Sequence, residues 1–165
     1  MVRFYCFLIL LLSAVLRGES APPPARYAQS DSILIMQHLK AITKTNGYRN
    51  YKNLPLLNQT AEYIFSVFRQ YADTVYYQPY QVEGITYKNV ICRLGSANNK
   101  PLVVIGAHYD VCGDQEGADD NASGVVGLLE LARILSKEKL NYPVELVAYC
   151  LEEPPFFGIA IKLIL

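Results

Sequence analysis

The first half of the chain contains two segments in which apolar residues recur every three or four positions, the spacing of an amphipathic helix. The first begins after a helix-capping residue, Ser30 or Asp31, and should end near Asn46-Gly47. The second begins after Pro55 and Asn58. The apolar positions are Ile33, Leu34, Leu39 and Ile42 in the first segment and Ala61, Ile64, Phe65 and Phe68 in the second. We expect two helices whose apolar stripes face the core.

A different pattern, rich in tyrosine and valine, follows these helices. Residues 75–82 and 86–94 have the composition of β-strands. The turn-forming pair Glu83-Gly84 separates them, so they should form a hairpin.

The next part of the chain is predicted to form a strand, a loop, a helix and a second strand. Residues 102–107 form an apolar run without polar alternation, which predicts an interior strand covered on both faces. Residues 123–135 have helical periodicity, and Pro143 introduces another buried strand over residues 144–149. This βαβ unit predicts an α/β domain with a right-handed crossover.

Polar residues cluster after both of these strands, where open α/β sheets bind their ligands. His108-Tyr109-Asp110 follows the first strand and Glu152-Glu153 follows the second, while Asp119 and Asp120 precede the helix. Taken alone, the two aspartates could cap a helix in a solvated loop, and the glutamates could be an exposed strand end. Together, these donors favour a divalent metal, because zinc binds both imidazole nitrogen and carboxylate oxygen.

One histidine with several acids suits a site for two metal ions. Asp110, two residues after His108 on a strand, is placed to orient the imidazole of His108 from the side opposite the metal. Of the paired glutamates, one would bind the metal and its neighbour would accept a proton from the attacking water as general base.

Three motifs occur in a characteristic order: Gly106–Asp110, then Gly117–Gly124, then Glu152-Glu153. They resemble the motifs of the co-catalytic zinc aminopeptidases of clan MH, a group that includes bacterial leucyl aminopeptidases. The resemblance covers roughly residues 48–158. It implies the zinc-exopeptidase (phosphorylase/hydrolase-like) fold, an α/β fold with a mixed, largely parallel central sheet flanked by helices.

The resemblance also implies roles for individual residues. His108 would bind one zinc ion, Glu153 would bind the other, and Asp119 would bridge the two. Glu152 would be the general base, and Asp110 would orient His108. The implied reaction is zinc-dependent hydrolysis of the first peptide bond of peptides that have a free N-terminus.

Three other functions stay open. Related glutaminyl cyclases share the scaffold but use one zinc ion and are acyltransferases. A catalytically dead binding or decoy protein could retain the fold. A calcium-binding loop could use acids such as Asp114 and Glu116, but His108 argues against that interpretation.

The resemblance implies two further ligands, an aspartate and a histidine downstream of the glutamate pair, and neither follows Glu153 here. His38 lies in the first predicted helix, where we expect a structural role. We therefore interpret residues 29–158 as the N-terminal portion of a peptidase domain and residues 159–165 as an aberrant apolar tail. The chain as given should show little or no peptidase activity.

The first twenty residues have the features of a signal peptide. Arg3 precedes the apolar run Phe4–Leu16, which is shorter than the roughly 20 residues that a membrane-spanning helix needs. A proline-rich linker follows over residues 21–28. We expect cleavage, secretion or export to the periplasm, and no stable membrane span afterwards; an uncleaved signal anchor is the alternative.

The charge balance and the cysteine residues lead to two further expectations, one about nucleic-acid binding and one about disulfides. The 15 basic and 15 acidic side chains give no charge excess for binding nucleic acid. Cys92, Cys112 and Cys150 form an odd set in which at most one disulfide can close, and all three are expected to be buried thiols.

Overall fold

The computed structural model describes residues 28–72, 74–96 and 99–157. The expected signal peptide (1–20), all but the last residue of the linker (21–28) and the apolar tail (159–165) lie outside these residues. Within the described ranges, we find no helix with the length and apolar character that crossing a membrane requires.

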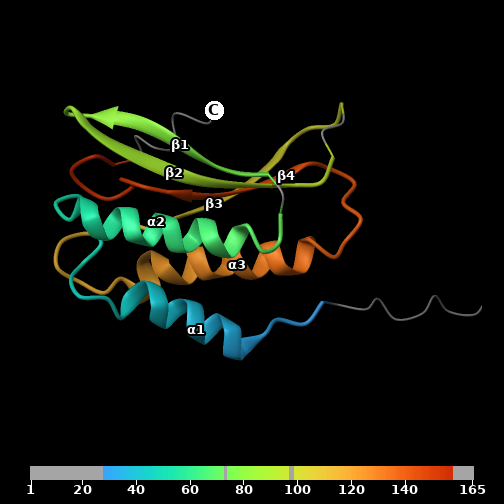
Figure 1. The fold of residues 1–165 in the computed structure, drawn as a ribbon, viewed down its shortest axis with the longest axis horizontal. Coiled ribbons are helices and arrows are strands. Elements are labelled where there is room, and N and C mark those ends of the chain that lie inside the picture. Colours follow the sequence, from blue (N-terminus) through green and yellow to red (C-terminus); the bar gives the residue numbers. More distant parts are fainter. Residues whose placement is uncertain (1–27, 73, 97–98, 158–165) are drawn as a thin grey trace, which may run out of the picture.

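Three α-helices and four strands make up the described fold (Figure 1). In chain order they are α1 (Ser32–Thr43), α2 (Leu54–Phe68), β1 (Thr74–Val82), β2 (Ile85–Leu94), β3 (Val103–His108), α3 (Ser123–Leu135) and β4 (Val144–Tyr149). A short distorted turn, η1 (Ala118–Ala122), leads into α3. This α/β order agrees with the sequence analysis.

The two N-terminal helices begin at capping side chains. The Asp31 carboxylate accepts hydrogen bonds from the backbone N–H groups of Ile33 and Leu34, as a capping residue does. Helix α2 starts earlier than predicted: the Asn53 side chain caps it, and Pro55 lies within its first turn, where a proline needs no hydrogen-bond acceptor.

The strands form one sheet in the order β1-β2-β4-β3. The predicted hairpin is confirmed, since β1 and β2 pair antiparallel from Thr74↔Arg93 to Val82↔Ile85. Strand β2 pairs antiparallel with β4, and β3 pairs parallel with β4. The described sheet is therefore mixed, as expected, but it is not largely parallel, because the hairpin occupies the place next to β4.

The helices lie on one side of this sheet (Figure 1). Helices α2 and α3 pack directly beneath the strands, and α1 lies below them. The hydrophobic core between the two layers includes Ile64 of α2, Leu129 of α3, Val90 and Cys92 of β2 and Leu146 of β4. Burial of these side chains fixes the sheet on the helices.

Strand β3 corrects one prediction. It was expected to be covered on both faces, yet Val103, Val104 and Ile105 are 41%, 40% and 36% exposed. The reason is its position, because β3 is one of the two edge strands of the described sheet and has only β4 beside it. Strand β4 has a neighbour on each side and is buried from Val144 to Ala148, as predicted.

Candidate metal centre

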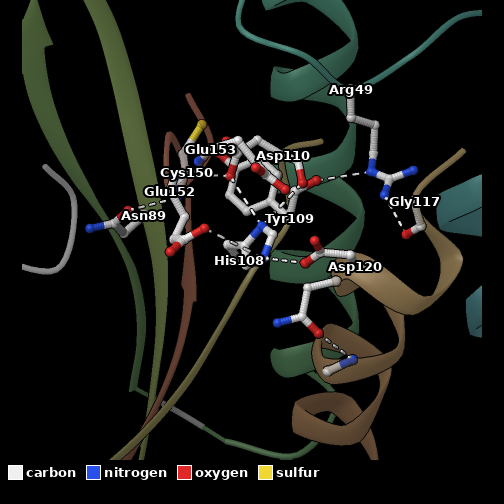
Figure 2. A network of polar contacts seen from close by, with 12 residues as sticks. Arg49, Asn89, His108, Tyr109, Asp110, Gly117, Asp120, Cys150, Glu152 and Glu153 are labelled. Atoms are coloured by element: carbon white, nitrogen blue, oxygen red, sulfur yellow. Dashed lines mark hydrogen bonds and ion pairs between the residues drawn. The ribbon is translucent and has the colours of Figure 1, made fainter. Parts of the chain in front are cut away.

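The parallel pairing of β3 and β4 brings the carboxyl ends of both strands to the same edge of the sheet. His108, the last residue of β3, lies opposite Tyr149, the last residue of β4. The backbone N–H of Tyr109 continues the pairing by donating to the carbonyl of Tyr149. The chain segments that carry Asp110 and the two glutamates are thereby placed side by side, as Figure 2 shows.

Asp110 joins the two segments. Its side chain is 2% exposed, and its two carboxylate oxygens accept hydrogen bonds from the backbone N–H groups of Glu152 (3.2 Å) and Glu153 (3.1 Å). One of these oxygens also lies 3.6 Å from Nδ1 of His108. Asp110 is therefore placed to fix both the imidazole and the backbone of the glutamate pair (Figure 2).

The other nitrogen of His108 faces acids. Its Nε2 lies 3.0 Å from Oδ1 of Asp120 and 3.7 Å from Oε2 of Glu152. His108, Glu152 and Glu153 each offer a ligand atom within 4.8 Å of the other two, a spacing that can hold a metal ion. One imidazole and several carboxylates are the donors that zinc accepts.

The ionisation of these residues reflects a concentration of negative charge. Burial alone would lower the pKa of His108, but the hydrogen bond to Asp110 and the charges of Asp110 and Glu152 outweigh it and raise the pKa to about 9. Burial and the neighbouring charge of Asp120 raise the pKa of Glu153. The carboxylates therefore favour a positive charge at this place, which the proton on His108 supplies in metal-free protein and which a bound cation could supply instead.

The resemblance gives the bridging role to Asp119, whereas Asp120 is the aspartate that contacts His108 in the structure. The Asp119 carboxylate accepts a hydrogen bond from the backbone N–H of Asp120, and Asp119 is exposed. Asp120, which we had not selected, points to His108. The backbone of Asp120 is extended and not helical (φ −124°, ψ 94°), so its side chain does not project as it would from a regular helical turn. Spacing along the sequence does not distinguish two adjacent acids, so no sequence signal separated them.

The turn that carries Asp120 depends on Gly117. This glycine has a φ of +56°, and a Cβ on it would lie 2.2 Å from Cγ1 of Val111 and 2.6 Å from the carbonyl oxygen of Asp120. Both distances are below 3.0 Å, a separation that real Cβ atoms essentially never show, so a side chain here would force its neighbours to move. Gly113, in the same loop, has a φ of +63° but open space around it.

Gly117→Ala should therefore destabilise the protein by about 2–5 kcal/mol, the sum of left-handed strain and a steric clash. Gly113→Ala is the matched control and should cost only the strain, about 1–2 kcal/mol. Urea unfolding of both variants measures the difference. Equal losses would show that the space around Gly117 does not matter.

Polar residues outside the predicted set support the turn after β4. Asn89 accepts a hydrogen bond from the backbone N–H of Cys150, and the hydroxyl of Tyr80 donates to the Cys150 carbonyl. These contacts join residues more than sixty positions apart, which single-sequence patterns do not reveal. Cys92 and Cys150 are buried free thiols, as expected, whereas Cys112 is exposed because its loop lies at the surface.

The sheet edge and its donors define an α/β protein with a candidate divalent-metal centre at the carboxyl ends of two parallel strands. Residues 89–159 match the model of Peptidase family M28. The matched segment contains all the residues that meet at the centre.

The chain is also similar to two proteins from other organisms. The chain is 42% identical over 147 residues to the uncharacterized protein YfbL of Escherichia coli, a match that covers 84% of this chain and 45% of YfbL. It is 34% identical over 76 residues to leucine aminopeptidase 2 of Trichophyton equinum, covering 46% of this chain and 15% of that protein. The chain thus spans less than half the length of these relatives.

Solved structures share the fold. The crystal structure of LapB from Legionella pneumophila is similar with a TM-score of 0.66 and 26% identity, over 79% of this chain and 37% of LapB. The glutaminyl cyclase of Tannerella forsythia has a TM-score of 0.69 at 17% identity, over 83% of this chain and 56% of that chain, which shows the fold alone.

Proposed function

We propose that this chain carries zinc-binding and proton-transfer residues of a metalloexopeptidase of the aminopeptidase type. The observation that carries the proposal is the convergence of His108, Asp120, Glu152 and Glu153 around the buried Asp110. Because the chain spans less than half the length of its relatives, zinc binding is assigned to the described residues and the activity to the protein as a whole.

The donor set fits zinc. In this proposal His108, Glu153 and Asp120 would hold the metal, with Asp120 in place of the Asp119 that the resemblance implied. The Asp120 side chain is 65% exposed, which leaves carboxylate surface for a second ion. The raised pKa values of His108 and Glu153 support a site that gains stability from added positive charge.

Zinc bound at this centre would supply a Lewis acid that polarises the scissile carbonyl and lowers the pKa of the attacking water. Glu152 accepts the proton of that water and passes it to the departing amine. Its backbone is fixed by Asp110, while its side chain remains partly open to solvent and to substrate. Asp110 faces Nδ1 of His108, which leaves Nε2 as the ligand nitrogen.

The substrate class proposed is peptides with a free N-terminus, and the expected signal peptide supports action outside the cytoplasm. A direct assay compares a peptide that has a free N-terminus with its N-acetylated form, using protein of the length of its relatives before and after chelation. Hydrolysis of the free form alone, lost with the chelator and restored by zinc, is expected. Equal hydrolysis of both peptides, or activity that survives metal removal, would contradict the proposal.

The pH dependence of stability offers a second test. In metal-free protein, the pKa of His108 is raised from 6.5 to about 9 by folding, so its stabilising contribution is complete below about pH 6.5 and is lost as the pH rises through about 9. The raised pKa of Glu153 acts in the same direction from lower pH. Stability measured by urea unfolding should therefore fall across this window.

His108→Gln is the control for this pH dependence, because it removes the titrating group but keeps a polar side chain. The variant should lose most of the slope above pH 6.5. A wild-type stability that stays flat or rises with pH across the window would show that His108 is not held by these carboxylates.

A further inference from the structure

Arg49 is a buried cation outside the proposed ligand set. It is 1% exposed, and its guanidinium donates four hydrogen bonds, all to backbone carbonyls. Nε donates to Tyr109 (2.9 Å), Nη1 to Ile42 (2.9 Å) and Glu116 (2.8 Å), and Nη2 to Gly117 (3.2 Å). Burying a charged group among neutral acceptors is costly, so this arrangement calls for an explanation beyond packing.

Three of the four carbonyls that Arg49 binds belong to the two segments that carry the candidate ligands, and the fourth, that of Ile42, belongs to α1. Tyr109 lies between His108 and Asp110 at the end of β3. Glu116 and Gly117 immediately precede η1, which carries Asp120. Figure 2 shows the Arg49 side chain between these segments, with Gly117 on one side and the end of β3 on the other.

The backbone and the next residue extend the same contact. The carbonyl of Arg49 accepts a hydrogen bond from the backbone N–H of Val111, and the Asn50 side chain donates to the carbonyl of Gly113 and to the carboxylate of Asp114. Residues 49–50 thus hold the loop between β3 and η1 at both of its ends.

Only an arginine meets the geometry of this position. Its planar guanidinium has five N–H donors in a fixed arrangement, whereas a lysine has one ammonium group on a flexible stem. Burial lowers the pKa of Arg49 to about 10, so the group stays charged at neutral pH, and the nearby Asp110 favours the charged form. Its positive charge also lies beside the acid-rich edge of the sheet.

We infer that Arg49 is a positioning residue of the metal centre, which fixes the Asp120-bearing turn against the strand end that carries His108. It acts through the backbone and binds neither metal nor substrate. The inference rests on the proposed function in so far as the centre binds zinc; the fixing of the loop does not depend on it.

The test measures zinc affinity and fold stability separately in Arg49→Met, Arg49→Lys and the wild-type chain. Zinc affinity is read by competition with a chromophoric chelator, well below each unfolding midpoint. Lys44→Met is the matched control, because Lys44 contacts Glu116 of the same loop through an exposed ion pair. The control should bind zinc as the wild type does.

In the folded Arg49→Met variant, the zinc dissociation constant should rise about 10- to 100-fold, the loss usual for groups that orient metal ligands. Arg49→Lys should be weakened less. Folded variants with wild-type zinc affinity would overturn the inference and leave a merely structural role. Absence of zinc binding by the wild type itself would instead refute the proposed function.

If the variants do not fold, a measurement on the wild type tests whether Arg49 fixes the loop beside the metal centre. The Arg49 Nε–H resonance should be protected from exchange with water in metal-free protein, because it donates to the Tyr109 carbonyl. A rapidly exchanging Nε–H would overturn the fixing of the loop. Where the wild type binds zinc, a resonance that zinc does not shift would overturn the link to the metal centre.

Discussion

Glu153→Ala should raise the zinc dissociation constant by more than about 100-fold, because losing a ligand costs more than the 10- to 100-fold loss of an orienting group. Glu153 is buried at the sheet edge, and its backbone N–H is held by Asp110. Burial and neighbouring negative charges oppose its ionisation in metal-free protein. Removing the carboxylate should therefore leave the stability of the metal-free fold unchanged or slightly increased.

Weaker zinc binding without loss of stability would identify Glu153 as a zinc ligand and not as a structural residue. Zinc content after dialysis and the free energy of unfolding in chelator are the two measurements. Glu138→Ala, at an exposed position just beyond α3, serves as the control for loss of a glutamate and should keep wild-type zinc content. A Glu153→Ala variant that retains zinc would remove Glu153 from the ligand set.

Glu152→Gln should lower kcat for peptide hydrolysis by about 10²- to 10⁴-fold, the usual contribution of general acid–base catalysis. The amide keeps the size of the side chain but does not accept a proton. Its backbone N–H still donates to Asp110, so the fold should be unchanged. The measurement is made on active protein of the length of its relatives, beside zinc content.

The pair of glutamate variants distinguishes a base from a ligand. A carboxylate oxygen of Glu152 lies 3.7 Å from Nε2 of His108, so both glutamates can reach a metal held there. If Glu152→Gln loses zinc and Glu153→Ala keeps it, the two roles are exchanged. If both lose zinc, both are ligands and the base must be sought elsewhere.

The sequence predicted the edge of the sheet at which the centre lies. Apolar runs that end in His108 and before Glu152 are strong signals, because the carboxyl ends of parallel strands meet at one edge. The exposure of β3 was missed because an apolar run does not report how many neighbours a strand has. That property depends on the arrangement of the whole sheet.

Sequence patterns did not predict the hydrogen bonds that hold the candidate metal centre together. Asp120 is distinguished from Asp119 by backbone dihedral angles, which adjacent identical residues do not encode in their spacing. Arg49 and Asn89 act through hydrogen bonds to residues about sixty positions away. Neither lies in the three motifs that contain the candidate site residues, and their partners are backbone groups that every residue possesses.

The position of β4 in the sheet also governs when the centre can assemble. The strand order β1-β2-β4-β3 places the last-synthesised strand of the described chain between two earlier ones. The hairpin can form locally as soon as it is made, whereas β3 has no partner until Val144–Tyr149 emerges during translation. Sheet closure and the meeting of His108 with the glutamates are therefore expected to be one late folding event.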